Sequence, residues 1–333
     1  MRQKERVPSA TQGTNRAVAG LTSLLLAGVA SSVLTTPAEA LSIVPTYSAL
    51  VTASAKTAFA FAAAEYQNLF TDPVQVNIQV NTNTSGLGMS STPLLGINTY
   101  AQTRTALMND YTANPSAART TAESSGGSIF TTTDPTSGGH FYYARADAKA
   151  LGLIASDAAN DGTFTYNRNQ TYTFNPANRQ VAGAFDFIGV AEHEISEIMG
   201  RISLLGANLD GSPDFLPYEL FRYTGNNTRG ITNNGAGNYF SINNGTTNLK
   251  NYNNAAMNGG DAQDWDTSDP TDPYNFATGP GQGHMISAVD ITAMNILGWD
   301  TQAQAPVPEP GTLALLGTAL FGFGVLRRRR RIG

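Results

Sequence analysis

Apolar residues recur along the chain with two periods, which predict both helices and strands. Residues 74–80 (Val-Gln-Val-Asn-Ile-Gln-Val) alternate strictly, as expected for a strand with one buried face. Residues 53–70 are dense in Ala, and residues 285–297 place Ile, Val, Met and Leu at helical spacing, so both segments predict helices. The same reasoning predicts helices at 99–112, at 146–153 and from 187 onward, and strands at 141–145, 162–166, 171–174, 219–223 and 239–242.

The segment that follows residue 200 has a different composition from the rest of the chain. It is rich in Asn and Gly, which favour turns, and little helix is expected before residue 285. Residues 41–300 are long enough for one sizeable domain. We therefore predict an α+β domain with a mixed sheet and an irregular C-terminal lobe, followed by a linker at 301–306.

The first 40 residues have the order of a secretory signal peptide. Residues 2–16 carry four Lys or Arg side chains, residues 17–34 are apolar and small, and Ala38-Glu39-Ala40 offers a cleavage site. The alternative is an N-terminal membrane anchor, but this apolar run is short for a bilayer span and is diluted by Ser, Thr and Gly. We expect the export machinery to read residues 1–40 and the mature chain to begin at residue 41.

Residues 307–333 hold three parts in a fixed order. The sequence Val-Pro-Glu-Pro-Gly at 307–311 precedes an apolar transmembrane segment at 312–326 and five arginines at 327–331. This order resembles the PEP-CTERM sorting signal of exported bacterial proteins, which an exosortase-type enzyme reads. It implies that the apolar segment enters the inner membrane transiently while the arginines stay cytoplasmic. An ordinary C-terminal tail anchor is the alternative, and either one places the body in the envelope, at the outer surface or outside the cell.

Charge and cysteine content narrow the classes of function. The chain has 20 Lys and Arg against 25 Asp and Glu, and the two terminal segments hold 9 basic and 3 acidic residues, so 41–306 carries a net charge of −11. An acidic body lacks the basic surface that binding to nucleic acid requires. There is no Cys, so disulfides, thiolate metal sites and Cys nucleophiles are excluded.

A His-Glu pair in the helix predicted from residue 187 carries the strongest chemical signal. His193 and Glu197 are four residues apart, which places them on one helix face about 6 Å apart along the axis. In the HExxH pattern, two His at these positions hold Zn²⁺ and the Glu between them activates water. Glu197 takes the place of the second His here. We predict that His193 and Glu197 bind Zn²⁺, that Glu194 is the general base, and that Gly200 lets the helix end.

A zinc site needs a third ligand, which this helix does not supply. Ser203 stands where the longer HExxHxxGxxH pattern has its third His, and a hydroxyl is a poor zinc ligand. Glu192 projects about 100° away from His193 around the helix and is a poor candidate. The remaining candidates are His284, Asp210 and His140, with Asp214 and Glu219 as further carboxylates nearby.

The helix resembles that of zincin and metzincin peptidases in an HExxE variant. The body also resembles a group of exported bacterial proteins classed as zinc metalloproteases, in residues 186–197, 219–223, 239–242, 264–265 and 290–298. This resemblance implies a zincin-like domain with an active-site helix, in which His193 is a metal ligand and Glu194 the general base. A peptide or protein would be the substrate.

Other interpretations remain open at this point. Glu197 and Arg201 have the spacing of an ion pair on a solvated helix face, and the domain would then be an inactivated scaffold that serves as a non-catalytic envelope or matrix protein. A structural metal clamp is a third hypothesis. The acidic run Asp261, Asp264, Asp266, Asp269 and Asp272 indicates a solvated loop, with Ca²⁺ binding as the alternative.

Overall fold

The computed structural model describes residues 40–124, 129–231 and 235–302. The predicted signal peptide, the transmembrane segment and the basic tail therefore lie outside the described residues. Within the described part, no helix is long and apolar enough to cross a membrane.

The main sheet is mixed, as predicted, and has four strands in the order β1-β2-β6-β3. Strands β1 (Ser42–Tyr47), β2 (Gln75–Asn83) and β6 (Gly162–Asn167) run parallel, and β3 (Gly88–Ser91) pairs antiparallel with β6 at the edge. Helix α1 (Ala53–Leu69) joins β1 to β2. A connection between parallel neighbours needs such a crossover, and the Ala-rich segment provides it.

Apolar periodicity explains how α1 and the sheet pack. The alternating residues of β2 bury Val76, Ile78 and Val80, and α1 buries a face of small residues together with Phe59. The Phe59 ring stacks on that of Phe164 in β6, with centroids 5.8 Å apart. Small Ala side chains let the helix approach the strands closely.

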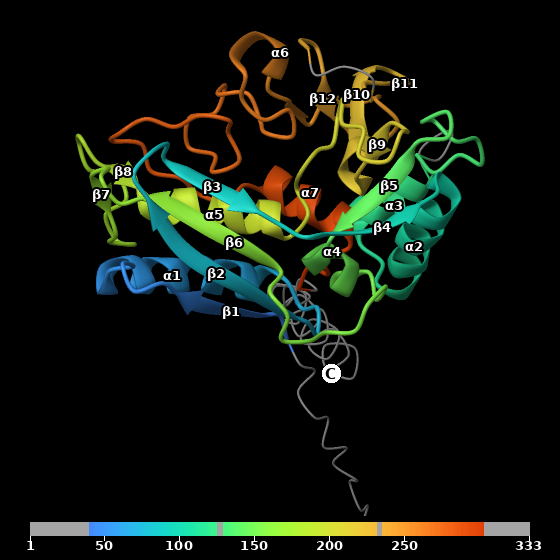
Figure 1. Ribbon diagram of the computed structural model, residues 1–333. Coiled ribbons are helices and arrows are strands. Elements are labelled where there is room, and N and C mark those ends of the chain that lie inside the picture. The colour runs from blue at the N-terminus through green and yellow to red at the C-terminus, as the bar shows by residue number, and fades with distance from the viewer. Residues whose placement is uncertain (1–39, 125–128, 232–234, 303–333) are drawn as a thin grey trace, which may run out of the picture. The chain divides into compact units, whose positions relative to one another are not determined.

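Helix α5 (Phe187–Ile198) lies between α1 and the edge strand β3 (Figure 1). The Asp186 side chain caps its N-terminus by accepting a hydrogen bond from the Ile188 amide at 3.1 Å. Helical spacing predicts one buried stripe of Ala191, Ile195, Ile198 and Ile202; the first three are fully buried, and Ile202, which follows the end of α5, is half-buried. Nearly every other residue of α5 is buried too, so this is a central helix whose polar residues are held inside the protein.

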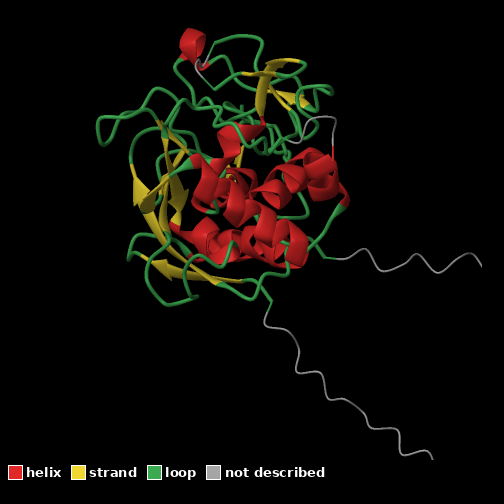
Figure 2. Ribbon diagram, turned by 90° about the vertical axis from the view of Figure 1, so that its right-hand side faces the viewer, coloured by secondary structure: helices red, strands yellow, loops and turns green. Residues whose placement is uncertain are grey.

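A second group of elements lies beside the main sheet. Strands β4 (Leu94–Asn98), β5 (His140–Ala144) and β9 (Asp214–Phe215) form a three-stranded sheet. The helices that accompany them are α2 (Tyr100–Ala113), α3 (Ala117–Ser124), α4 (Arg145–Ala150) and α7 (Ala288–Leu297). Strands β7 (Tyr172–Thr173) and β8 (Phe185–Asp186) form a separate two-stranded sheet. Figure 2 shows the helices gathered together, with strands along one side.

The segment between α5 and α7 is mostly loop, as its Asn and Gly content predicts. Besides β9 and a 3-10 helix, its regular elements are the short strands β10 (Arg222–Gly225), β11 (Thr228–Arg229), β12 (Tyr239–Phe240) and β13 (Lys250–Asn251) and the one-turn helix α6 (Ala255–Asn258). The strand predicted at 219–223 is wrong in its first half, where Pro217–Phe221 forms the 3-10 helix η1. Pro217 favours a helical start, and the Glu219 carboxylate accepts a hydrogen bond from the Leu216 amide.

Asp72 connects the start of β2 to the C-terminal end of the domain. Its buried carboxylate accepts a hydrogen bond from the Asp300 amide at 2.9 Å. Burial, together with the charge of Asp300, raises the pKa of Asp72 to about 8. An unfolded Asp titrates near about 4, so the folded chain binds the extra proton and unfolding releases it. The stability that this proton contributes is lost as the pH rises from about 4 through about 8.

We expect the free energy of unfolding to fall with rising pH in this window, with Asp72 alone contributing up to about 1.4 kcal/mol per pH unit. Asp72→Asn keeps an uncharged side chain of the same shape and should flatten that dependence. Urea unfolding of both proteins at several pH values between about 5 and 8 measures the two slopes. Equal slopes in the two proteins would show that Asp72 does not hold the proton.

Candidate functional site

Helix α5 presents the predicted residues to one cavity and then stops sharply. The helix ends at Ile198 with Met199 as its C-cap, and Gly200 follows with φ of 115°, a conformation that favours glycine. A Cβ at Gly200 would lie 2.9 Å from Cβ of Asp147, so a larger residue would also clash. The predicted role of Gly200 at the end of the helix is confirmed.

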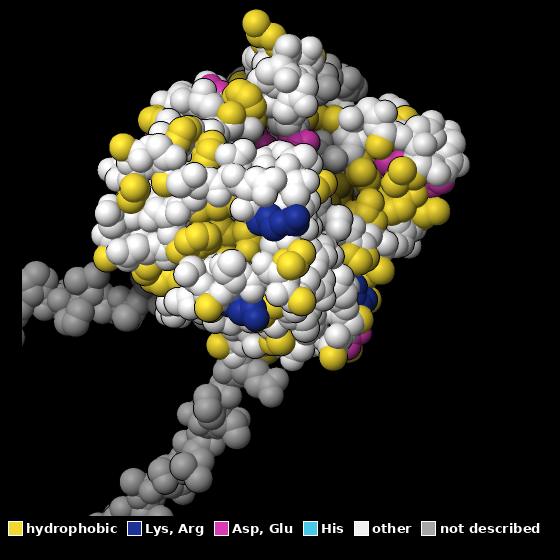
Figure 3. Space-filling view, turned by 60° about the vertical axis from the view of Figure 1, so that its left-hand side comes forward, with side chains coloured by type: hydrophobic (Ala, Val, Ile, Leu, Met, Phe, Trp, Pro, Cys, Tyr) yellow, Lys and Arg dark blue, Asp and Glu magenta, His cyan; other side chains and the backbone are white. Residues whose placement is uncertain are grey.

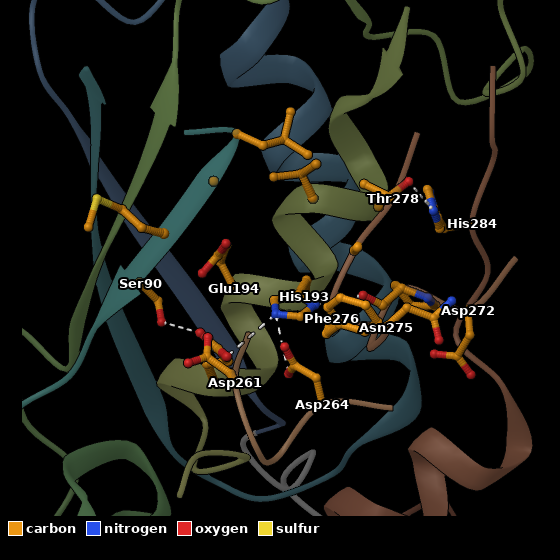
Figure 4. A pocket seen from close by; sticks show the side chains of 18 residues that line it. Ser90, His193, Glu194, Asp261, Asp264, Asp272, Asn275, Phe276, Thr278 and His284 are labelled. Carbon is orange, nitrogen blue, oxygen red and sulfur yellow. Dashed lines mark hydrogen bonds and ion pairs between the residues drawn. The ribbon is translucent and has the colours of Figure 1, made fainter. Parts of the chain in front are cut away.

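The cavity has a volume of about 360 Å³ and lies between β3, α5 and the segment 261–284 (Figure 4). Its lining contains five acidic residues and, among the described residues, no Lys or Arg: Glu194, Glu197, Asp261, Asp264 and Asp272. Basic side chains are also few and scattered on the face drawn in Figure 3. The site is thus acidic, with His193 among its carboxylates.

Hydrogen bonding fixes the orientation of His193. Its Nδ1 lies 2.8 Å from the Pro273 carbonyl oxygen, which can only accept, so Nδ1 carries a proton and donates it. Nε2 then faces Oε1 of Glu197 at 3.4 Å and Oδ1 of Asp264 at 3.5 Å. A backbone carbonyl that binds one ring nitrogen and leaves the other free for a metal is the usual arrangement of a ligating His.

The spacing of these three side chains fits one small cation. The ligand atoms of His193, Glu197 and Asp264 all lie within 4.8 Å of one another. Ligands about 2.0–2.1 Å from a tetrahedral zinc ion lie about 3.4 Å apart, which agrees with the two separations measured from Nε2. One nitrogen and two carboxylates are a donor set that zinc accepts.

Neighbouring side chains hold Glu197 in place and keep it ionised. Oε2 accepts a hydrogen bond from Oγ of Ser90 at 2.6 Å, and Oε1 accepts one from Nε2 of Gln263 at 2.9 Å. Burial opposes the charge, but the hydrogen bond and charge of His193 and the charge of Arg201 keep the pKa of Glu197 below its usual range. Glu197 therefore stands ready as an anionic ligand.

Arg201 is fully buried behind the three ligand-type residues. Its Nη1 donates to Oδ1 of Asp264 at 2.7 Å, and its guanidinium lies over the Tyr274 ring at 4.4 Å. Nη2 is 3.9 Å from Oε1 of Glu197, so the ion pair predicted from the spacing exists. The solvated helix face is nevertheless wrong, because both partners are buried.

The two Glu residues of the motif differ in the direction of their pKa shifts. Glu194 is 6% exposed, and its Oε1 lies so close to Gly88 that a Cβ there would be 2.7 Å from it. Burial and the charge of Glu197 raise the pKa of Glu194 well above its usual range. Two adjacent carboxyl groups with pKa values pushed apart are typical of a general acid or base beside an ionised partner.

Without a metal, the charges of the site are matched by its own side chains. Burial lowers the pKa of His193, but the charge of Asp264 and the hydrogen bond and charge of Glu197 raise it overall to about 10. Protonated His193 and the Arg201 guanidinium thus face the carboxylates of Glu197 and Asp264. Because a metal binds the neutral imidazole, a dication would have to displace the His193 proton.

His284, one of the predicted third ligands, lines the same cavity but has other partners. Its Nε2 lies 2.8 Å from Oγ1 of Thr278, and its Nδ1 lies 3.3 Å from Oδ2 of Asp186. Gly189 leaves room for the ring, since a Cβ there would lie 2.5 Å from Nδ1. His284 thus fixes the N-terminal end of α5 and is not grouped with His193.

The other predicted ligands lie elsewhere. His140 Nδ1 pairs with Oδ2 of Asp210 at 2.5 Å, and these two form a separate cluster with Asp214 where β5 meets β9. Glu219 accepts hydrogen bonds from Oγ of Ser203 at 2.8 Å and from the Leu204 amide at 2.7 Å, which shapes the turn after α5. Residues His140, Asp210, Asp214 and Glu219 do not line the cavity.

Asp264 is the site residue that sequence reasoning did not place. The acidic run was interpreted as a solvated loop, which is wrong for Asp264 and Asp272, since these are 2% and 1% exposed. Asp269, with 47% of its side chain exposed, does face solvent. Trp265, fully buried beside Asp264, was the sequence signal for a segment packed inside the protein. Ca²⁺ binding by this run stays a prediction.

Comparison with known proteins identifies the C-terminal signal. Residues 306–331 match the family model of the PEP-CTERM protein-sorting motif. The chain is therefore an exported bacterial protein that an exosortase-type enzyme sorts, and it is processed at its C-terminus and anchored to, or released from, the cell envelope. No curated protein and no solved structure matches the chain.

Proposed function

We propose that this protein is a zinc-dependent peptidase of zincin-like fold that acts outside the cytoplasm. The observation that carries the proposal is the convergence of His193 Nε2, a Glu197 oxygen and an Asp264 oxygen beside the buried Glu194 carboxyl. His193, Glu197 and Asp264 would hold the zinc. The mixed sheet and the HExxE helix beside its edge strand support the zincin-like assignment.

Each residue has a defined part in hydrolysis. When bound, zinc supplies an electrophile that polarises the scissile carbonyl and lowers the pKa of water. Glu194 takes a proton from the attacking water and then gives it to the amine nitrogen that leaves. Its raised pKa makes the carboxylate a stronger base toward the attacking water, and the carboxylic acid so formed can return the proton. The products are a carboxylic acid and an amine.

Surrounding contacts keep this arrangement rigid. Pro273 orients His193, Ser90 and Gln263 orient Glu197, and Arg201 orients Asp264. Such outer partners raise metal affinity by about 10–100-fold each in characterised sites. They come from β3, from the 261–284 segment and from the turn that follows α5, so that the site forms only when the domain is folded.

Metal-dependent cleavage of an unstructured protein such as casein tests the proposal. We expect cleavage to stop in excess chelator and to return when zinc is added after the chelator is removed. Cleavage that persists in chelator would contradict a zinc mechanism. A bound metal without any cleavage would instead indicate a structural clamp, and it would remove the peptidase assignment.

A further inference from the structure

One carboxylate of the cavity is not used by the site described above. Asp261 lines the cavity but is exposed, and its carboxylate makes no hydrogen bond or ion pair with the described part of the chain. Its main chain is fixed, because its carbonyl oxygen accepts a hydrogen bond from Nδ2 of Asn253 at 3.0 Å. Figure 4 shows Asp261 on the same side of His193 as Asp264.

The other charges of the cavity are already matched. Arg201 pairs with Asp264, and Asp272 pairs with Lys250. With zinc on His193, Glu197 and Asp264, the ion also matches the two ligand carboxylates. The carboxylate of Asp261 is then left without a partner, in a cavity whose lining, among the described residues, contains no Lys or Arg. A concave surface that carries charge of one sign attracts ligands of the opposite charge.

The walls of the cavity suit a long cationic side chain. Leu87, Met89, Val190 and Phe276 give the cavity apolar surface between its polar groups. Lys and Arg lay their methylene stems along apolar surface and keep the charged end in a wet, polar place. An exposed carboxylate in a cavity with apolar side chains in its walls offers both environments to one side chain.

We propose that Asp261 makes this cavity select peptides with a Lys or Arg side chain close to the scissile bond. The inference rests on the proposed peptidase function, which it extends to a substrate class. Peptides with an acidic residue at that position should be disfavoured, because they would meet Asp261 as well as the carboxylates of the site.

The test compares peptides that differ in one charge. Each set contains three labelled peptides that are identical except at one position, which holds Arg, its neutral analogue citrulline, or Glu. Further sets place this variable residue at the other positions of the peptide. Binding is measured by fluorescence anisotropy to the Glu194→Gln protein loaded with zinc, so that hydrolysis is not needed for a result. We expect Arg to bind roughly tenfold more tightly than citrulline at one position, and Glu to bind most weakly.

Asp261→Asn in the same background should bring the ratio of Arg to citrulline close to one, and Asp261→Lys should favour Glu. Asp266→Asn is the control, because Asp266 carries the same charge five positions after Asp261 but does not line the cavity. This variant should keep the preference for Arg over citrulline. An equal ratio in the parent protein, or an unchanged ratio in Asp261→Asn, would overturn the inference. Loss of zinc from Asp261→Asn would also overturn it, by making Asp261 a metal ligand.

The two proposals fail in different ways. Selective binding of the Arg peptide that depends on Asp261, without cleavage by the unmodified protein, would remove the peptidase function and leave the cation preference standing. Cleavage that is indifferent to the charge of the substrate would leave the peptidase and remove the preference.

Discussion

Glu194→Gln is expected to abolish peptide hydrolysis while leaving the fold and the bound zinc unchanged. Gln has the same shape as Glu, but it can neither accept nor return a proton at neutral pH. General acid-base catalysis typically contributes a factor of about 10²–10⁴, so kcat should fall by at least that much. The side chain is not among the three grouped ligand residues, and the metal content should therefore stay the same.

The rate of cleavage of a quenched peptide by equal amounts of zinc-loaded protein measures this effect. Glu123→Gln is the matched control, because Glu123 lies in α3 and does not line the cavity. The control should retain full activity. Cleavage by Glu194→Gln at a rate near that of the unmodified protein would show that another group moves the proton.

Much of the helical and strand content could be predicted from local pattern. The Ala-rich helix α1, the alternating strand β2 and the capped helix α5 formed where apolar periodicity placed them. His193, Glu194 and Glu197 were also predictable as a group, because they lie within one and a half turns of a single helix and helical geometry brings them together.

The third ligand-type residue could not be predicted in the same way. Asp264 follows His193 by 71 positions, in a segment without regular structure. Its carboxylate is held beside the helix by Arg201, whose guanidinium in turn packs on the ring of Tyr274. The sequence offered five Asp in this run, and local composition made all of them equally polar. Only tertiary packing decides that Asp264 is buried and Asp269 is not.

Short strands were missed for a related reason. Edge strand β3 has the sequence Gly-Met-Ser-Ser and no alternating apolar pattern. It nevertheless places Ser90 within hydrogen-bonding distance of Glu197 and Gly88 close to the carboxyl group of Glu194. Its pairing with β6 supplies the order that its own sequence lacks. Strand β1 has no alternating pattern in its sequence, because Pro45 and the polar residues Ser42 and Thr46 interrupt its apolar positions, although it pairs with β2 in a regular parallel register.

Removing one of the ligand-type residues is expected to have the second large effect. His193→Ala removes the nitrogen ligand and should reduce zinc affinity by more than the roughly 10–100-fold that loss of an outer partner costs. Asp264→Ala should lose zinc as well, and it should also destabilise the protein by about 3–5 kcal/mol, because Arg201 is then left buried without its main partner. Urea unfolding of both variants without metal separates the two effects.

His140→Ala provides the matched control for metal binding. His140 belongs to the other cluster of potential ligands, with Asp210 and Asp214. If zinc binds at His193, this variant should keep its metal. The two His substitutions together therefore decide which cluster is the metal site.

The central claim is that His193, Glu197 and Asp264 bind zinc, and metal content by plasma mass spectrometry tests it most directly. The unmodified protein, His193→Ala and His140→Ala are loaded with zinc, dialysed against metal-free buffer and compared. We predict about one zinc per chain in the unmodified protein and in His140→Ala, and none in His193→Ala. Absence of zinc from the unmodified protein, or its retention in His193→Ala, would contradict the account.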